Sequence, residues 1–245
     1  MLRTSSRGSL LPVPNRGKHN YIELCNMVCR RLNEVEIPIE EFLVTRGVQS
    51  LIKDAVVASI QKINQAEFEW PFNAAEHTEI LVKGQVEYAW PVHFKTVDYN
   101  TFQIVKDADL SVGHKTLRLI ERDEWYSKHR DRDYDAGKDG RGIPDFVFAS
   151  HGSGFGVSPS PNNNYMLRFR YYLSPATMQG WDDACFIPPA FNDVIINGAL
   201  YHMYMFRDNA EASATTLETF KAGLKDMQIL LMNSPDYLRD TRVNF

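Results

Sequence analysis

Three cysteines in 245 residues are too few, and too unevenly spaced, for a disulfide framework, which is typical of a reducing compartment. No apolar run reaches about 18 residues without a charge, so no transmembrane helix is expected. The chain contains no Gly-x-Ser-x-Gly nucleophile elbow, and its seven histidines include no HxH or HExxH pair. Its net charge of −4 gives no global reason to expect nucleic acid or an anionic membrane as the main partner.

Two cysteines share a helix face without the pattern of a metal site. Cys25 and Cys29 lie four residues apart in a predicted helix, so both side chains fall on the same side of it. The surrounding sequence, CNMVCRRLNE, supplies no further ligands at zinc or iron–sulfur spacing. We therefore expect buried thiols there. His202 lies on a strongly apolar predicted helix, and we expect a core or interface residue rather than a ligand.

An acidic segment only partly resembles a calcium loop. Asp131, Asp133 and Asp135 hold positions 1, 3 and 5 of the motif. The place of the turn glycine is taken by Ala136, and that of the bidentate acid by Gly142, so both essential features are missing. We therefore expect a solvated, salt-bridged segment with no metal, and the sequence indicates no cofactor elsewhere.

Alternating glycines distinguish the segment ASHGSGFGVSPSPNNN. Gly152, Gly154 and Gly156 could form a phosphate cradle, but no helix and no Gly-Lys-Ser/Thr ending follows them. The prolines and asparagines that come next are residues of turns. The prediction is a glycine-rich loop between strands that carries no chemistry.

Two helices are predicted in the first quarter of the chain from apolar residues three and four positions apart. The first covers residues 21–33 and starts with a capping box of Asn20 and Glu23. The second covers residues 47–66.

Two further helices are predicted near the other end. The third follows the pair Pro188-Pro189 and is apolar over most of its circumference, as expected of a helix buried on several sides. The fourth carries a seam with alternating spacings of three and four. We expect the four helices to bury these stripes against one another as a bundle, with Ile195 and Leu224 in its core.

Between the helix pairs, side chains alternate with the two-residue period of β-strands. The sequence HTEILVKGQVEYAWP predicts a β-hairpin around Gly84. The sequence YMLRFRYYL predicts a half-buried strand whose outer face carries Arg168 and Arg170. The charged stretch of residues 121–142 is predicted to be partly helical. Further strands are expected at residues 101–106, 116–120 and 145–149.

The expected fold class is α+β, with a four-helix bundle formed by the N- and C-terminal helix pairs and an antiparallel β-rich insert between them. The bundle comprises residues 20–67 and 188–232, and the insert comprises residues 68–187. Residues 1–19 and 233–245 are predicted to be arms.

The N-terminal arm is basic. Its first eighteen residues contain four Arg or Lys, three Ser and no acid, a composition shared with mitochondrial transit peptides. Pro12 and Pro14 disfavour the amphipathic helix that such a peptide needs, and no apolar core for a secretory signal is present. The sequence favours a flexible basic arm.

Four stretches of the chain carry a family pattern in a fixed order. They are KDAVVASIQKINQAEFEWPF, GQVEYAWP, GVSPSPNNNYMLRFRYYLSP and IPPAFNDVIINGALYHMYMFRDNAEASATTLETFKAGL. Trp70 followed by Pro71 and Phe72 ends the second helix, and Pro159 with Pro161 leads into the last strand. The sequence resembles the head-to-tail adaptors (connectors) of tailed phages, a family that includes the tail tubular protein A type, over roughly residues 20–232.

The resemblance implies a structural protein of the virion neck or tail rather than an enzyme. It implies a ring of about twelve copies that joins the portal protein to a tail or nozzle protein, lines the DNA channel and contacts the DNA non-specifically. It also implies assembly in the host cytoplasm, no catalytic residues, no cofactor and no membrane partner.

Two other functions stay open at this point. One is a tail-associated polysaccharide hydrolase, in which Glu121 with Asp123 or Glu124 would serve as acid and base near the aromatic residues Trp125 and Tyr126. The other is a tail-completion or terminator ring, which the residues do not distinguish from an adaptor.

The C-terminal arm carries the only partner-binding residues that we predict. After Pro235 too few apolar groups remain to offset the entropy of ordering the chain alone. Isolated aromatic and aliphatic anchors with neighbouring arginines suit the pockets and acidic rim of a partner. The predicted residues are Tyr237, Leu238, Arg239, Arg242 and Phe245.

Overall fold

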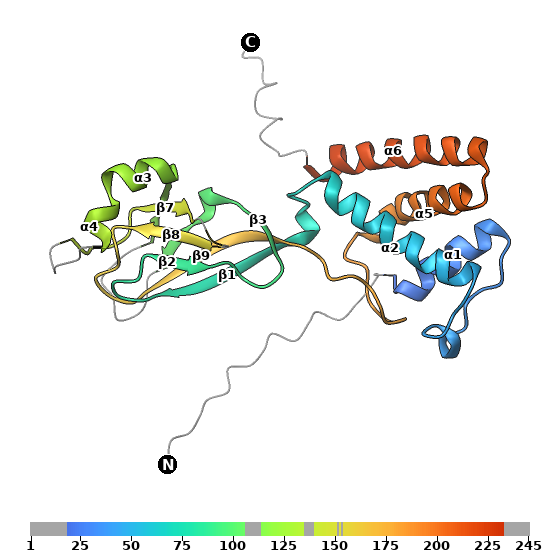
Figure 1. Ribbon diagram of the computed structural model, residues 1–245, viewed down its shortest axis with the longest axis horizontal. Coiled ribbons are helices and arrows are strands. Elements are labelled where there is room, and N and C mark those ends of the chain that lie inside the picture. Colours follow the sequence, from blue (N-terminus) through green and yellow to red (C-terminus); the bar gives the residue numbers. More distant parts are fainter. Residues whose placement is uncertain (1–18, 106–113, 135–139, 151, 153, 233–245) are drawn as a thin grey trace, which may run out of the picture. The chain divides into compact units, whose positions relative to one another are not determined.

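The structure is a computed structural model that describes residues 19–105, 114–134, 140–150, 152 and 154–232 (Figure 1). The chain divides into two compact units. One lies within residues 1–63 and 177–227 and is called the helical unit below. The other lies within residues 64–176 and 228–245 and is called the β unit. Helices and sheets therefore occur together, and the expected α+β class is confirmed.

The helices of the two chain ends follow the stripes in the sequence. They are α1 (Tyr21–Leu32), η1 (Ile39–Glu41), α2 (Val48–Ala66), η4 (Pro189–Phe191), α5 (Asn192–Phe206) and α6 (Ala210–Met232). The predicted capping box is confirmed, because the Glu23 side chain accepts a hydrogen bond from the Asn20 backbone N–H at 2.9 Å. Asn33 ends α1 with a left-handed backbone conformation, φ 55°.

The start of α1 is tied to a segment that is distant in sequence. The backbone N–H of Tyr21 donates to the carbonyl of Asp183 at 2.9 Å, and that of Ile22 donates to Trp181 at 3.2 Å. The carbonyl of His19 accepts from Cys185 at 3.1 Å. These bonds satisfy amide groups that a helix N-terminus leaves without an intrahelical partner. Residues 181–185 thus belong to the helical unit together with α1.

Helix α5 occupies the middle of the helical unit. Its Ile195 is fully buried, as predicted, and its carbonyl accepts a hydrogen bond at 2.8 Å from Ser59 of α2. A Cβ on Gly198 would lie 2.2 Å from the Ser59 oxygen, so only glycine allows this approach of α2 to α5. Helix α6 runs beside α5 (Figure 1), and a Cβ on Gly223 would meet the Val194 side chain at 2.9 Å.

The seam of α6 is buried at fewer positions than predicted. Phe220 and Met227 are buried, whereas Leu224 is only half-buried. The expectation that Leu224 lies in the core was therefore only partly correct. Phe220, one turn before it, and Met227, one turn after it, take the central positions.

The β unit contains two sheets. The first has five strands, β1 (Ala74–Leu81), β3 (Phe94–Val97), β4 (Gln103–Val105), β5 (Lys115–Thr116) and β9 (Tyr165–Leu173). Strand β9 pairs with β1, β3 and β4, and β4 pairs with β5, all antiparallel. The second has four strands in the order β2 (Glu87–Ala89), β8 (Gly154–Ser158), β7 (Phe146–Ala149) and β6 (Arg118–Leu119). Among the named strands of the described residues, β6 and β7 are the one parallel pair. The shorter elements are η2 (Pro71–Asn73), η3 (Tyr99–Thr101), α3 (Arg122–Lys128) and α4 (Arg130–Tyr134).

An aromatic core joins the two sheets. Phe169 of β9 and Phe155 of β8 have ring centroids 5.4 Å apart, and Phe102 lies 4.5 Å from Phe169 and 5.4 Å from Phe155. The alternation predicted for β9 is confirmed, because Phe169 is buried while Arg168 and Arg170 are exposed. The predicted helicity of residues 121–142 is also confirmed by α3 and α4.

The prediction of a loop holds for only part of the glycine-rich segment. Gly152 lies in the connection between β7 and β8, whereas Gly154 and Gly156 lie in a strand. Gly154–Ser158 forms β8, in which every residue is buried between β2 and β7. A Cβ on Gly156 would lie 2.1 Å from the Phe148 ring, so the glycine makes room for an aromatic side chain of the neighbouring strand. Phe155 and Val157 face the other way, into the core between the sheets.

The predicted hairpin around Gly84 was also wrong. The turn exists, since Gln85 donates its backbone N–H to Val82 at 3.0 Å. Strand β1 before it pairs with β9, however, and β2 after it pairs with β8 in the other sheet. The turn therefore connects the two sheets. The alternation of apolar and polar residues in the sequence does not reveal that the two strands belong to different sheets.

Candidate interaction surface

One acid of the calcium-like segment, Asp133, is used for folding. Asp133 is buried, accepts a hydrogen bond from the indole N–H of Trp125 at 2.9 Å and accepts the backbone N–H of Ser160 at 3.3 Å. It thereby fixes α3 and α4 to the chain that follows β8, and Trp125 stacks on Phe148 at 4.1 Å. In the part of the chain that the structure describes, no group of three or more His, Cys, Asp or Glu side chains could hold a metal ion. Asp135 lies outside that part.

Glu124, one of the acids considered for a hydrolase, has the wrong environment for a general acid. Glu124 is exposed, and its carboxylate accepts a hydrogen bond from Lys128 at 2.9 Å. This hydrogen bond, with the charge of Lys128, lowers the pKa of Glu124. A glycosidase acid needs a raised pKa, so the environment of Glu124 is the reverse of what that chemistry requires.

The thiols of α1 are core residues, as predicted. Cys25 and Cys29 are fully buried, and burial raises the pKa of both, that of Cys29 to about 11. Because the thiolate is the form that attacks substrates and binds metals, this burial disfavours both roles.

We expect His202 to make folding sensitive to acid. Burial of this α5 side chain, followed by the nearby charge of Lys62, lowers its pKa. Its contribution to stability is therefore complete above the unfolded pKa of about 6.5 and is lost as the pH falls through the lower folded value. We expect His202→Gln to reduce the loss of unfolding free energy between about pH 7.5 and 5.5, measured by urea denaturation. The exposed His114→Gln is the control, and an equal effect from it would contradict this assignment.

The loop between α1 and α2, residues 33–47, is held in place by specific contacts. The side-chain amide of Asn26 accepts the backbone N–H of Ile37 at 2.8 Å and donates to its carbonyl at 3.2 Å. Ile37 and Phe42 are buried, and the Phe42 ring meets the edge of Tyr21 at 5.2 Å. Lys53 donates to the carbonyl of Phe42 at 2.7 Å and lies over its ring. The loop therefore has a defined conformation although it contains only one short 3₁₀ turn.

This defined loop exposes apolar side chains that a soluble surface seldom groups together. Their exposed fractions lie between 51% and 78%. Four exposed apolar side chains on one loop of fifteen residues are candidates for a protein–protein contact. We call these four residues the apolar loop surface: Val35, Ile39, Leu43 and Val44.

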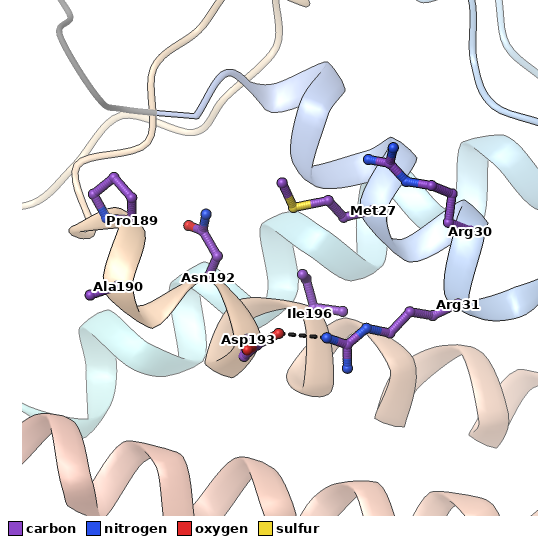
Figure 2. A pocket seen from close by; sticks show the side chains of 8 residues that line it. All are labelled: Met27, Arg30, Arg31, Pro189, Ala190, Asn192, Asp193 and Ile196. Atoms are coloured by element: carbon purple, nitrogen blue, oxygen red, sulfur yellow. Dashed lines mark hydrogen bonds and ion pairs between the residues drawn. The ribbon is translucent and has the colours of Figure 1, made fainter.

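A second feature of the helical unit is a cationic hollow between α1 and α5 (Figure 2). It has a volume of about 380 Å³. Figure 2 shows the Arg31 side chain directed at Asp193, and their nitrogen and oxygen lie 2.5 Å apart. Arg30, at the same rim, lies 3.5 Å from Glu36 of the loop. Because both arginines are paired with carboxylates, the hollow has no unpaired cation to hold an anion.

Comparison with known families identifies the chain. The family model described as SU10 adaptor protein matches residues 19–243, which is almost the whole sequence. The chain belongs to the SU10 adaptor protein family. This adaptor is therefore a phage head-to-tail adaptor, a structural protein of the virion neck or tail, and the resemblance seen in the sequence is confirmed. No curated protein matches it significantly.

Two further observations concern partners of the adaptor. Among its described residues, no helix is both long and apolar enough to cross a membrane. The residues predicted to bind a partner all lie outside the described part of the chain: Tyr237, Leu238, Arg239, Arg242 and Phe245. The apolar loop surface was not predicted, although a run of apolar and acidic residues without helical period was visible between the first two helices.

Proposed function

We propose that this adaptor assembles in the host cytoplasm into a closed ring of about twelve copies that joins the portal to the tail or nozzle and surrounds the DNA channel. The observation that carries the proposal is the family match over residues 19–243. A subunit in a cyclic ring meets its two neighbours through two different surfaces. Exposed apolar side chains at the end of α5, Met205 and Phe206, support such contacts in the helical unit.

The helical unit suits the role of a rigid building block in such a ring. We propose that α1, α2, α5 and α6 act as one four-helix bundle. The hydrogen bond from Ser59 to Ile195, the pair of Arg31 with Asp193 and the contact of Gly223 with Val194 link α5 to each of the other three helices. A body held in this way could transmit load between portal and tail without bending.

The mass of the assembly tests the ring. We expect native mass spectrometry of the purified adaptor with the portal protein to show a complex that contains one ring of adaptor subunits. Native mass spectrometry of the adaptor alone should show monomers or the same ring. A complex with the portal in which the adaptor is bound as separate single copies, or no complex at all, would contradict the proposal.

We propose that the C-terminal segment provides a portal contact. Deletion of residues 234–245 should leave the thermal unfolding midpoint of the adaptor within about 1 °C, because the segment has too little apolar surface to add to a core. It should weaken portal binding at least about tenfold, since Tyr237, Leu238 and Phe245 would act as anchors. Asn244→Ala, a change in the same segment outside the predicted anchors, serves as a control. A deletion variant that binds the portal as tightly as the full-length adaptor would refute the contact.

A further inference from the structure

The apolar loop surface is ready for a partner without rearrangement. The side-chain clamp of Asn26 on Ile37 and the buried ring of Phe42 fix the backbone on which Val35, Ile39, Leu43 and Val44 stand. In the described part of the chain, more than half of each of these four side chains is exposed. A fixed apolar surface loses little conformational entropy when a ligand binds.

The loop that carries the surface has a net negative charge, with four glutamates against one arginine, Arg46. The loop contains Glu34, Glu36, Glu40 and Glu41. Glu34 pairs with Arg207, and Glu36 lies 3.5 Å from Arg30. Among the described residues, neither Glu40 nor Glu41 has an ion-pair partner, and both are exposed. A partner with positive charge and a few apolar side chains would match this surface in both respects.

The adaptor itself contains a segment of that chemistry. We infer that residues 1–18 of the chain bind the apolar loop surface of the same copy. The segment carries Arg3, Arg7, Arg16 and Lys18 and no acid. Its apolar residues, which include Leu10, Leu11 and Val13, fall between the basic ones. Apolar groups would cover the exposed loop residues while the cations meet Glu40 and Glu41.

The point of attachment places the segment beside its site. The segment joins the described chain at His19, and Tyr21, two residues later, touches Phe42 of the loop. A hollow of about 570 Å³ is lined by Tyr21 and Leu43 together with α2 residues such as Asp54 and Val57. Residues 10–13 precede His19 by six to nine positions, which spans about 20–30 Å when extended and is enough to reach the loop.

Attachment in the same chain also favours this occupant over a separate protein. A tethered segment of this length acts at an effective concentration of about millimolar, so contacts too weak for a free peptide are sufficient. Charge attraction at exposed sites is modest and is screened by salt, so the bound fraction should fall as ionic strength rises.

Hydrogen–deuterium exchange of the full-length adaptor and of its charge-reversal variants tests the inference. At low salt, amides of residues 2–18 should exchange at least about tenfold more slowly than in a free peptide of the same sequence. This protection should be lost in a triple variant, Arg3→Glu, Arg7→Glu and Arg16→Glu. It should also be lost in a double variant, Glu40→Arg and Glu41→Arg. The combination of all five substitutions should restore at least half of it, because the pairing is rebuilt with opposite signs.

A matched control and a dilution series separate this occupant from others. Glu218→Arg with Asp226→Arg makes the same change of net charge on exposed positions of α6 and should leave the protection intact. Protection should be unchanged over a hundredfold dilution into the monomeric range. The inference would be overturned if residues 2–18 of the unsubstituted adaptor exchanged at the free-peptide rate, or if the variant with all five substitutions did not regain protection. Loss of protection on dilution would also overturn it, in favour of binding to a second copy. None of these results depends on whether the ring with the portal forms.

Discussion

Phe155→Ala should lower the free energy of unfolding of the β unit by about 3–5 kcal/mol, because it leaves a cavity at the centre of the aromatic core. The side chain is fully buried. Its ring lies 5.1 Å from Trp90 and about as far from Tyr88, Phe102 and Phe169. None of these large rings can move into the vacated volume without leaving its own partners. Urea denaturation followed by tryptophan fluorescence measures the change.

The control for this experiment removes an apolar side chain from the surface of the same unit. Val92 is 78% exposed, so Val92→Ala should change the unfolding free energy by less than about 0.5 kcal/mol. A loss below about 1 kcal/mol for Phe155→Ala would mean that the two sheets do not share one packed core.

Gly198→Ala should destabilise the helical unit by about 1–3 kcal/mol, although alanine is the better helix former by about 1 kcal/mol. The added Cβ would lie 2.2 Å from the Ser59 oxygen and 2.9 Å from the Phe220 ring. Ser59 is held by its hydrogen bond to Ile195, and Phe220 is buried, so neither can withdraw freely. Thermal unfolding monitored by far-ultraviolet circular dichroism reports the effect.

A double-mutant cycle identifies the cause. Ser59→Ala removes the oxygen that is closest to the new methyl group, so Gly198→Ala should cost at least about 0.5 kcal/mol less in that background. Gly152→Ala is the matched control, because a Cβ there has no atom within 4 Å. Equal costs in both backgrounds would show that α2 and α5 do not approach each other at Gly198.

Local patterns in the sequence were sufficient for the helices and for β9. The stripes of α1, α2 and α5 and the alternation around Phe169 reflect burial of one face, which each segment encodes by itself. The capping box at Asn20 likewise depends only on residues within one turn.

Patterns that depend on a neighbour were misinterpreted. Gly154 and Gly156 are typical of turns, yet they lie in β8. The Phe148 ring fills the space beside Gly156, and the backbone of Tyr88 fills the space beside Gly154. Only the alternation of Phe155 and Val157 on the opposite face indicated a strand. The hairpin failed for a related reason, since alternation shows which residues face a core and not which strand is the partner.

The apolar loop surface also escaped prediction for a tertiary reason. Its conformation depends on Asn26, which lies eleven residues before Ile37, and on the ring contact between Tyr21 and Phe42. A loop of this length has no period from which such anchors could be read. Exposure of Val35 or Leu43 is likewise a property of the folded unit, since the sequence marks them only as apolar.

The bonds between the start of α1 and residues 181–185 also set an order of events during synthesis. Helix α1 leaves the ribosome first, but its N-terminal amides find their carbonyl partners only after residues 181–183, which follow the last strand β9, have been made. The described strands of both sheets lie within residues 74–173, so they are synthesised before these carbonyls. We expect the sheets to form before α5 has been synthesised and can pack against α1 and α2. The middle of this chain therefore folds before its beginning.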